Sequence, residues 1–364
     1  MERHPDVMQG RHLPAGLGDG FELRPGEPLG RGLRRLGIEQ CEAAIRRFAG
    51  EDVDLAVHEA RKAMKRIRAM LRLVRPVIGD RVYRYENRTL RDAARLLAGI
   101  RDGAVSVGTV GKIADRFGGA LPLDVFDDLS ERLDRRAVHI RQRIIHESDA
   151  IERVVATLER TRVRFATWPV DDTERSPYGS PLPDRFATIG GGLTRTYARG
   201  GQEMKRAYAS PDAHNFHMWR KRVKYLRHQM EILRPLYPEV VGATAFTLER
   251  LGDILGDEHD IAALLGLLAV TPRLCPDPTE RSLFAALAQH RRSELQAAAR
   301  VLGTRAYAEK PAAFATRIES YWDSVRFPTD VGIELTGSLD RGERPPLSLE
   351  AGARLPSVTV ERRV

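Results

Sequence analysis

Two stretches of the sequence carry cationic side chains at the same spacing. The first runs from His58 to Pro76 and reads HEARKAMKRIRAMLRLVRP, and the second runs from His217 to Pro235 and reads HMWRKRVKYLRHQMEILRP. A shift of 159 residues superimposes the two and keeps most of their Lys and Arg positions. Arginine can bind phosphate oxygens through two parallel hydrogen bonds, and lysine acts as a point charge. The repetition therefore indicates one charged surface that is built twice.

The positive charge of the chain is concentrated in these two stretches. His58–Arg75 holds seven Lys or Arg and one acid, and His217–Arg234 holds six and one, which gives +11 together against +9 for the whole chain. Like charges four residues apart cost a helix roughly 0.2–0.5 kcal/mol per pair, and a merely solvated face would interleave acids. A bound anion is therefore favoured. His58 and His217 could add pH-dependent donors, or could serve as caps near the helix starts.

Helices are needed to present these cations on one side. At about 100° per residue, the 52–75 stretch predicts an amphipathic helix with an apolar face that includes Met64 and Ile67. The opposite face collects His58, Arg61, Lys62, Lys65, Arg68, Ala69 and Arg72. The copy over 212–234 predicts a second such helix, and either Asp52 or Asp54 can cap the first.

The rest of the chain is also predicted to be helical, in two halves. Residues 1–28 are expected to form a disordered leader, 168–184 a linker with four prolines, and 326–364 a disordered tail. The first half, 29–167, has helical patterns at 29–48, 81–98 and 123–146, with short or irregular helix around the glycines at 99–111. The pattern after 146 continues toward residue 165. The second half, 185–325, has matching patterns at 186–208, 283–302 and 305–324. The expected fold is all-α, with two four-helix-type repeats about a pseudo-two-fold axis.

The composition indicates in which cellular compartment the protein is expected. The 364 residues contain two cysteines far apart in sequence, which favours a reducing environment without a disulfide framework. No apolar signal-peptide core or membrane-spanning run is found, so a cytoplasmic location is expected.

The doubled pattern His-x-x-Arg-Lys-x-x-Lys-x-x-Arg in a helical chain resembles the CHAD family, the conserved histidine α-helical domain. The stretches LAGIRD at 97–102 and LGDEHD at 255–260 are similar to the signature of that family after its third helix. The resemblance covers about 29–325 and implies two four-helix bundles with a basic central groove or pore. It also implies binding of inorganic polyphosphate and association with polyphosphate granules, without catalysis. No CYTH-like domain is found beside it, so the chain is similar to the standalone members.

Carried over by position, the resemblance implies a set of polyphosphate-binding residues. The set is His58, Arg61, Lys62, Lys65, Arg68 and Arg72, with His217, Arg220, Lys221, Lys224 and Arg227, and on the long helices Arg135, Arg136, Arg291 and Arg292. The chain departs from the family pattern at three positions. Glu231 stands at the position of Arg72 in the second copy, which predicts a lost contact and a repulsive charge. His259 and Ala98 replace an expected Arg and Gly.

Two other functions use the same charges. A nucleic-acid-binding protein would contact a phosphodiester backbone, but the isolated residues Trp168, Trp219 and Trp322 form no stacking platform. A phosphoanhydride-processing enzyme needs a metal centre or a general base, and the His259–Asp260 pair has too few companion ligands. Gly190–Gly192 follows no predicted strand and precedes no Gly-Lys-Ser/Thr, which excludes a phosphate-binding loop. No cofactor, metal or catalytic residue is expected.

Overall fold

A computed structural model describes residues 20–170 and 181–326. The α-helices of this part are α1 (Leu29–Phe48), α2 (Val53–Leu73), α3 (Arg75–Leu96), α4 (Ala98–Phe117), α5 (Leu123–His146), α6 (Ala150–Ala166), α7 (Ala187–Ala209), α8 (Ala213–Leu233), α9 (Pro238–Val270), α10 (Pro278–Ala306) and α11 (Pro311–Arg326). Two short 3-10 helices, Arg234–Leu236 and Pro272–Leu274, follow α8 and α9. The described ranges contain no strand, and the all-α prediction is confirmed.

The repeated basic stretches become α2 and α8, which begin in the same way. The side chain of Asp52 accepts a hydrogen bond from the backbone nitrogen of Leu55 at 2.9 Å, and the side chain of Asp212 accepts one from Asn215 at 2.7 Å. Each aspartate satisfies one of the amide groups left open at a helix start. The predicted apolar side of α2 is buried, including Met64 and Ile67.

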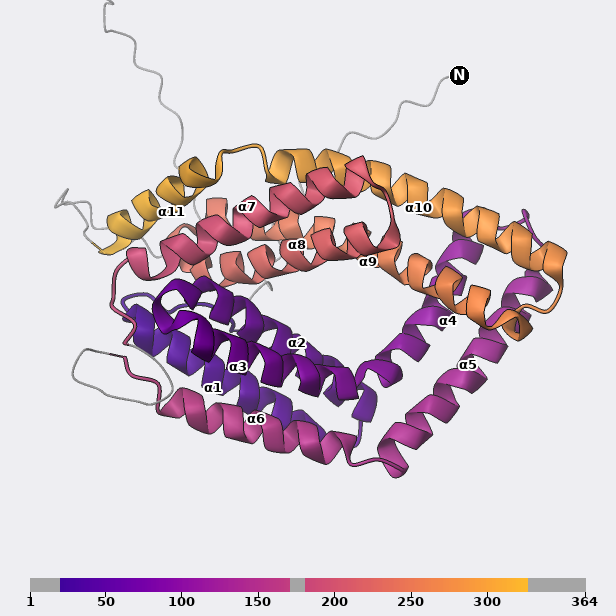
Figure 1. The fold of residues 1–364 in the computed structure, drawn as a ribbon, viewed down its shortest axis with the longest axis horizontal. Helices are drawn as coiled ribbons and strands as arrows, with labels where there is room; N and C mark the ends of the chain where they lie inside the picture. The colour runs from indigo at the N-terminus through magenta and orange to yellow at the C-terminus, as the bar shows by residue number, and fades with distance from the viewer. Residues whose placement is uncertain (1–19, 171–180, 327–364) are drawn as a thin grey trace, which may run out of the picture. The chain divides into compact units, whose positions relative to one another are not determined.

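The two halves share one core. Helices α1, α2, α3 and α6 pack on one side, α7, α8, α9 and α11 on the other, and α2 contacts both α7 and α8 (Figure 1). Met64 and Ile67 of α2 belong to the same apolar cluster as Trp219 and Val223 of α8. Burial of this joint cluster fixes α2 against α8, which is what positions the two basic faces.

Helices α4 and α5 pair with each other and pack on the second half. In Figure 1 they reach toward α9 and α10, and a second apolar cluster includes Ile113, Phe126, Ile261 and Phe284. The prediction of short or irregular helix at 99–111 is wrong, because α4 is continuous there. Two of its glycines serve close packing with α5: a Cβ on Gly99 would lie 2.9 Å from Ile144, and a Cβ on Gly103 would lie 2.6 Å from the Cβ of Ala137.

Two chain segments differ from the sequence expectation in detail. The pattern after His146 does not continue as one helix, because α5 ends there and α6 begins at Ala150. Residues 20–28, inside the predicted leader, lie on the core: Phe21 and Leu23 are only 3% and 5% exposed. The backbone nitrogen of Leu23 donates to the carbonyl of Ile232 at 3.1 Å. Residues 1–19 of the predicted leader, 171–180 of the predicted linker and 327–364 of the predicted tail lie outside the described residues.

Candidate anion-binding site

The basic faces of α2 and α8 meet where the two helices cross. Gln229 Nε2 donates to the carbonyl of Ala69 at 3.1 Å in the buried part of this crossing. The guanidinium of Arg68 reaches the hydroxyl of Tyr225 at 3.5 Å. Lys65 of α2 acts electrostatically on Lys224 of α8. The equivalent faces of the two repeats are therefore brought toward each other.

The pKa of Lys224 reflects its buried position among other cations. Burial, followed by Arg220, Lys65 and Arg227, lowers the pKa of Lys224 from 10.5 to about 7, and Asp253 acts in the other direction. Burial also lowers the pKa of Lys221. Burial disfavours the charged form of Lys224 and the neighbouring cations add to this effect, so an anion placed beside it would favour the charged form.

Arg68 and Arg72 of α2 are held mainly by neutral groups. Arg68 Nε donates to Asn87 Oδ1 at 3.1 Å. The guanidinium of Arg72 lies 3.8 Å from the ring centre of Tyr225 and 5.6 Å from that of Tyr83. Burial opposes ionisation of Tyr225, but Arg72 and Arg68 outweigh it, and the pKa of Tyr225 is lowered. Both guanidinium groups are fixed in place while their charge remains available.

The corresponding end of α8 is different. Glu231 accepts from Arg227 at 2.7 Å and from His228 at 2.8 Å, and Arg66 of α2 lies 3.9 Å away. Burial opposes ionisation of Glu231, but these partners lower its pKa to about 2. Arg227 is also bound by Glu249 at 2.7 Å. The expectation that Glu231 is a repulsive charge on the basic face is corrected: its carboxylate is a largely buried partner of three basic groups.

The two predicted histidines lie in different surroundings. His58 is exposed on α2. The ring of His217 lies 4.4 Å from that of His259, and burial lowers the pKa of each to about 4. Both imidazoles are neutral at pH 7, so His217 titrates well below the neutral range. Its Nδ1 is buried and has no hydrogen-bond partner among the described residues.

Three further predicted residues are anchored near the faces. Arg61 donates to the carbonyl of Ala94 on α3 at 2.9 Å. Lys62 lies 3.8 Å from Glu59. Arg220 lies on α8 beside His259, whose pKa it lowers, and its guanidinium approaches Gly256 of α9.

The arginines of the long helices are not placed alike. Arg135 and Arg136 are exposed on α5, and Arg135 pairs with Glu131 of its own helix at 2.6 Å. Arg292 is bound by the buried carboxylate of Glu258 at 2.6 Å. The structure therefore does not add these three to the meeting faces of α2 and α8.

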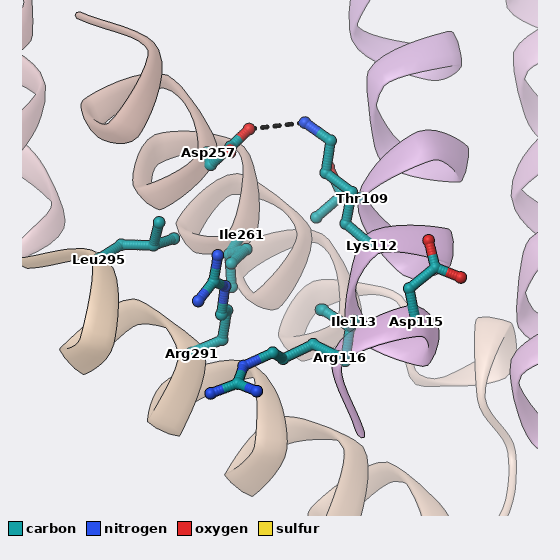
Figure 2. Close-up of a pocket in the computed structure, with 9 residues that line it drawn as sticks. All are labelled: Thr109, Lys112, Ile113, Asp115, Arg116, Asp257, Ile261, Arg291 and Leu295. Carbon is teal, nitrogen blue, oxygen red and sulfur yellow. Dashed lines mark hydrogen bonds and ion pairs between the residues drawn. The ribbon is translucent and has the colours of Figure 1, made fainter. Parts of the chain in front are cut away.

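Arg291 instead lines a cavity of about 320 Å³ between α4, α9 and α10 (Figure 2). The cations around it are paired: Lys112 with Asp257 at 2.6 Å, and both Arg116 and Arg291 with Glu294, at 2.8 and 2.6 Å. Because these cations are already paired with carboxylates, the cavity is a poor binding site for an anion.

A smaller cavity contains residues that the sequence analysis left out. It lies between α2, α3, α7 and α8 and measures about 40 Å³. Its lining consists of Arg72, Arg75, Tyr83, Arg195, Thr196, Arg199, Arg222 and Tyr225. The sequence does contain one indication that α7 contributes to this cavity. Arg195 and Arg199 stand four residues apart, and like-charge pairs at this spacing are what marked α2 as an anion-binding helix.

Among the described residues, no group of three or more His, Cys, Asp and Glu side chains could hold a metal ion. None of the helices in residues 20–170 and 181–326 is long and apolar enough to cross a membrane.

Comparison with known proteins adds two findings. The model of the CHAD domain matches residues 35–269. A solved structure, PptA from Streptomyces chartreusis, is similar over 78% of this chain and 100% of its own, with a TM-score of 0.52 and 16% identity, which indicates the same fold. No curated protein matches the chain.

Proposed function

The chain belongs to the CHAD family, and from this premise we propose that it binds inorganic polyphosphate along the facing sides of α2 and α8, without processing it. The observation that carries the proposal is the cluster of like charges at the crossing, where burial and then Arg220, Lys65 and Arg227 lower the pKa of Lys224 to about 7. A folded protein keeps such a cluster at a cost in stability, and a linear polyanion lying over it would offset that cost.

The binding set is centred on the α2–α8 crossing. Lys65, Arg68 and Arg72 would contact the polymer from α2, and Arg220, Lys221 and Lys224 from α8. His58, Arg61, Lys62 and His217 extend the set toward the helix starts, and Arg227 contributes less because two carboxylates hold it. Attachment to polyphosphate granules in the cytoplasm follows as part of the proposal.

A nucleic acid is the second candidate, because its backbone carries the same kind of charge. The site favours polyphosphate, since its aromatic rings at the crossing, Tyr83 and Tyr225, lie against arginines and are buried, so they offer no face for a base.

The test is a competition titration at moderate salt. Labelled long-chain polyphosphate is bound to the protein, and unlabelled polyphosphate, duplex DNA and single-stranded RNA are added at equal phosphate concentration. We expect polyphosphate to compete at least about tenfold better than either nucleic acid. Equal or better competition by DNA or RNA would replace the proposal with the nucleic-acid function.

A further inference from the structure

The cavity between α2, α3, α7 and α8 is an arginine pocket. Five of its eight lining residues are arginines: Arg72, Arg75, Arg195, Arg199 and Arg222. Arg72 also belongs to the basic face of α2, so the pocket continues directly from the proposed polyphosphate surface. We use the name arginine pocket for these five residues with Tyr83, Thr196 and Tyr225.

The charges of the arginine pocket are only partly balanced. In the described part of the chain, carboxylates approach two of the five guanidinium groups: Asp80 pairs with Arg75 at 2.7 Å, and Glu203 lies 3.7 Å from Arg222. Arg222 Nε is buried without a hydrogen-bond partner there. An oxyanion is the group that would satisfy these donors, because each guanidinium offers a planar pair of N–H groups.

The pseudo-symmetric counterpart of the arginine pocket shows which chemical groups an arginine site at this position can bind. A shift of 159 residues turns the Arg72–Tyr225 contact into the Glu231–Arg66 contact, and both are present, at 3.8 Å and 3.9 Å. Arg75 corresponds to Arg234 at the same shift, and Arg195 corresponds to Arg35 at a shift of 160 residues.

At that counterpart, the chain supplies its own anions. Glu22 accepts from Arg234 at 2.7 Å, and Glu27 accepts from Arg35 at 2.6 Å. Both carboxylates come from residues 20–28, which lie over this end of the crossing. One of two equivalent arginine sites is thus filled by carboxylates, and the other, the arginine pocket, has an excess of guanidinium groups.

The shape of the pocket limits what can enter. Of the lining residues, Tyr83, Thr196 and Tyr225 are only 6–8% exposed, whereas Arg195 and Arg199 are exposed. A volume of about 40 Å³ suits one phosphoryl group and leaves little room for further groups of a chain. A terminal phosphoryl group has three unbridged oxygens and, like a phosphate monoester, a second ionisation with a pKa of about 6. An interior group of the polymer has two such oxygens and a single charge.

We propose that the arginine pocket binds the terminal phosphoryl group of a linear polyphosphate whose body lies along α2 and α8. This inference rests on the proposed function and adds recognition of the chain end. It distinguishes a linear polymer from a cyclic one, which has no end.

The test compares linear tripolyphosphate with cyclic trimetaphosphate by calorimetric titration of the full chain. The pocket variant is Arg195→Gln with Arg199→Gln, at two exposed positions where the fold does not depend on the arginines. We expect the wild type to prefer the linear compound by at least about tenfold, and the variant to lose most of that preference while its affinity for long chains changes by less than about threefold.

A matched control separates end recognition from overall charge. Lys65→Gln with Lys224→Gln removes the same formal charge from the crossing, and it should weaken linear and cyclic ligands by similar factors. A pocket variant that keeps the linear preference overturns the inference. A wild type that binds long chains without preferring the linear compound overturns the pocket alone. A wild type that binds no long chain overturns the proposed function and this inference together.

Discussion

The two ends of the α2–α8 crossing occupy equivalent positions and have opposite charge balance. At the pocket end, Arg72 lies against Tyr225. At the filled end, Glu231 lies beside Arg66, and the carboxylates of residues 20–28 cover the neighbouring arginines. The duplication thus preserved which positions touch across the crossing but not which charges they carry. The filled end is suited to stability, and the pocket end is suited to a ligand.

The largest expected difference concerns stability at one pair of equivalent positions. Glu231→Gln leaves Arg66, Arg227 and His228 around a neutral amide, and loss of one member of a buried charge group costs about 3 kcal/mol. Arg72→Gln removes a cation–π contact but also relieves repulsion from other cations, so its cost should stay within about 1 kcal/mol. Urea denaturation monitored by circular dichroism measures both. Equal losses of unfolding free energy in the two variants would contradict the view that the Glu231 end stabilises the fold while the Arg72 end is suited to a ligand.

The same pair of ends can be compared through two glycines. A Cβ on Gly192 of α7 would overlap the backbone carbonyl of Leu73, which cannot move without shifting α2. At the equivalent Gly32 of α1, a Cβ would meet the flexible side chains of Leu23 and Glu27 at 2.5 and 2.8 Å. Gly192→Ala should lower the free energy of unfolding by about 3 kcal/mol and Gly32→Ala by about 1. A milder effect at Gly192 would mean that α7 does not approach α2 this closely.

A smaller difference is expected in ligand binding. Arg68→Gln removes a guanidinium held by neutral groups, and it should weaken polyphosphate binding by about tenfold or more. Arg227→Gln, at the equivalent position, removes a guanidinium already bound by Glu231 and Glu249, and its effect should stay within about threefold. Fluorescence titration with labelled polyphosphate at fixed salt gives both affinities. A larger loss of affinity in Arg227→Gln than in Arg68→Gln would contradict the prediction that the face of α2 contributes more to polyphosphate binding than the face of α8.

The smallest expected effect is the pH dependence of stability and of binding that Lys224 causes. Its pKa is about 7 in the folded protein and near its ordinary 10.5 in the unfolded chain, so between these values the unfolded state holds more protons. The contribution of Lys224 to the free energy of unfolding therefore rises with pH in this window. Polyphosphate should raise the folded pKa, so binding at pH 8 should take up a proton, and Lys224→Gln should reduce the uptake. Calorimetry in two buffers of different ionisation enthalpy measures it; an unchanged uptake in the variant would exclude Lys224 as the source.

The sequence predicted the helices that carry the faces because their charge and apolar patterns are local. The approximate bounds of α2 and α8 and the burial of Met64 and Ile67 could be read from helical periodicity. The continuous helix α4 could not, because Gly99 and Gly103 pack against residues of α5 that lie far along the chain, such as Ala137. Glycine is poor in a helix by itself, and only the packing partner explains its presence.

The candidate site could be proposed from the sequence only where the repeat preserved its residues. The cations of α2 and α8 stood out as a duplicated charge pattern, but the arginine pocket takes Arg195 and Arg199 from α7 and Tyr83 from α3. The role of Glu231 was also hidden, because its partner Arg66 comes from the other half of the chain. Pairings of this kind depend on how α2 crosses α8, which the sequence pattern alone does not fix.

The most direct test of the account is a titration of Lys65→Glu with Lys224→Glu against long-chain polyphosphate. The matched control is Arg305→Glu with Lys310→Glu, which makes the same charge change at two exposed residues of the α10–α11 region. The crossing variant should fold normally, since each new carboxylate lies among cations, and its affinity should fall by at least about a hundredfold. The control should stay within about threefold of the wild type. Binding by a well-folded crossing variant at wild-type affinity would contradict the assignment of the polyphosphate site to α2 and α8.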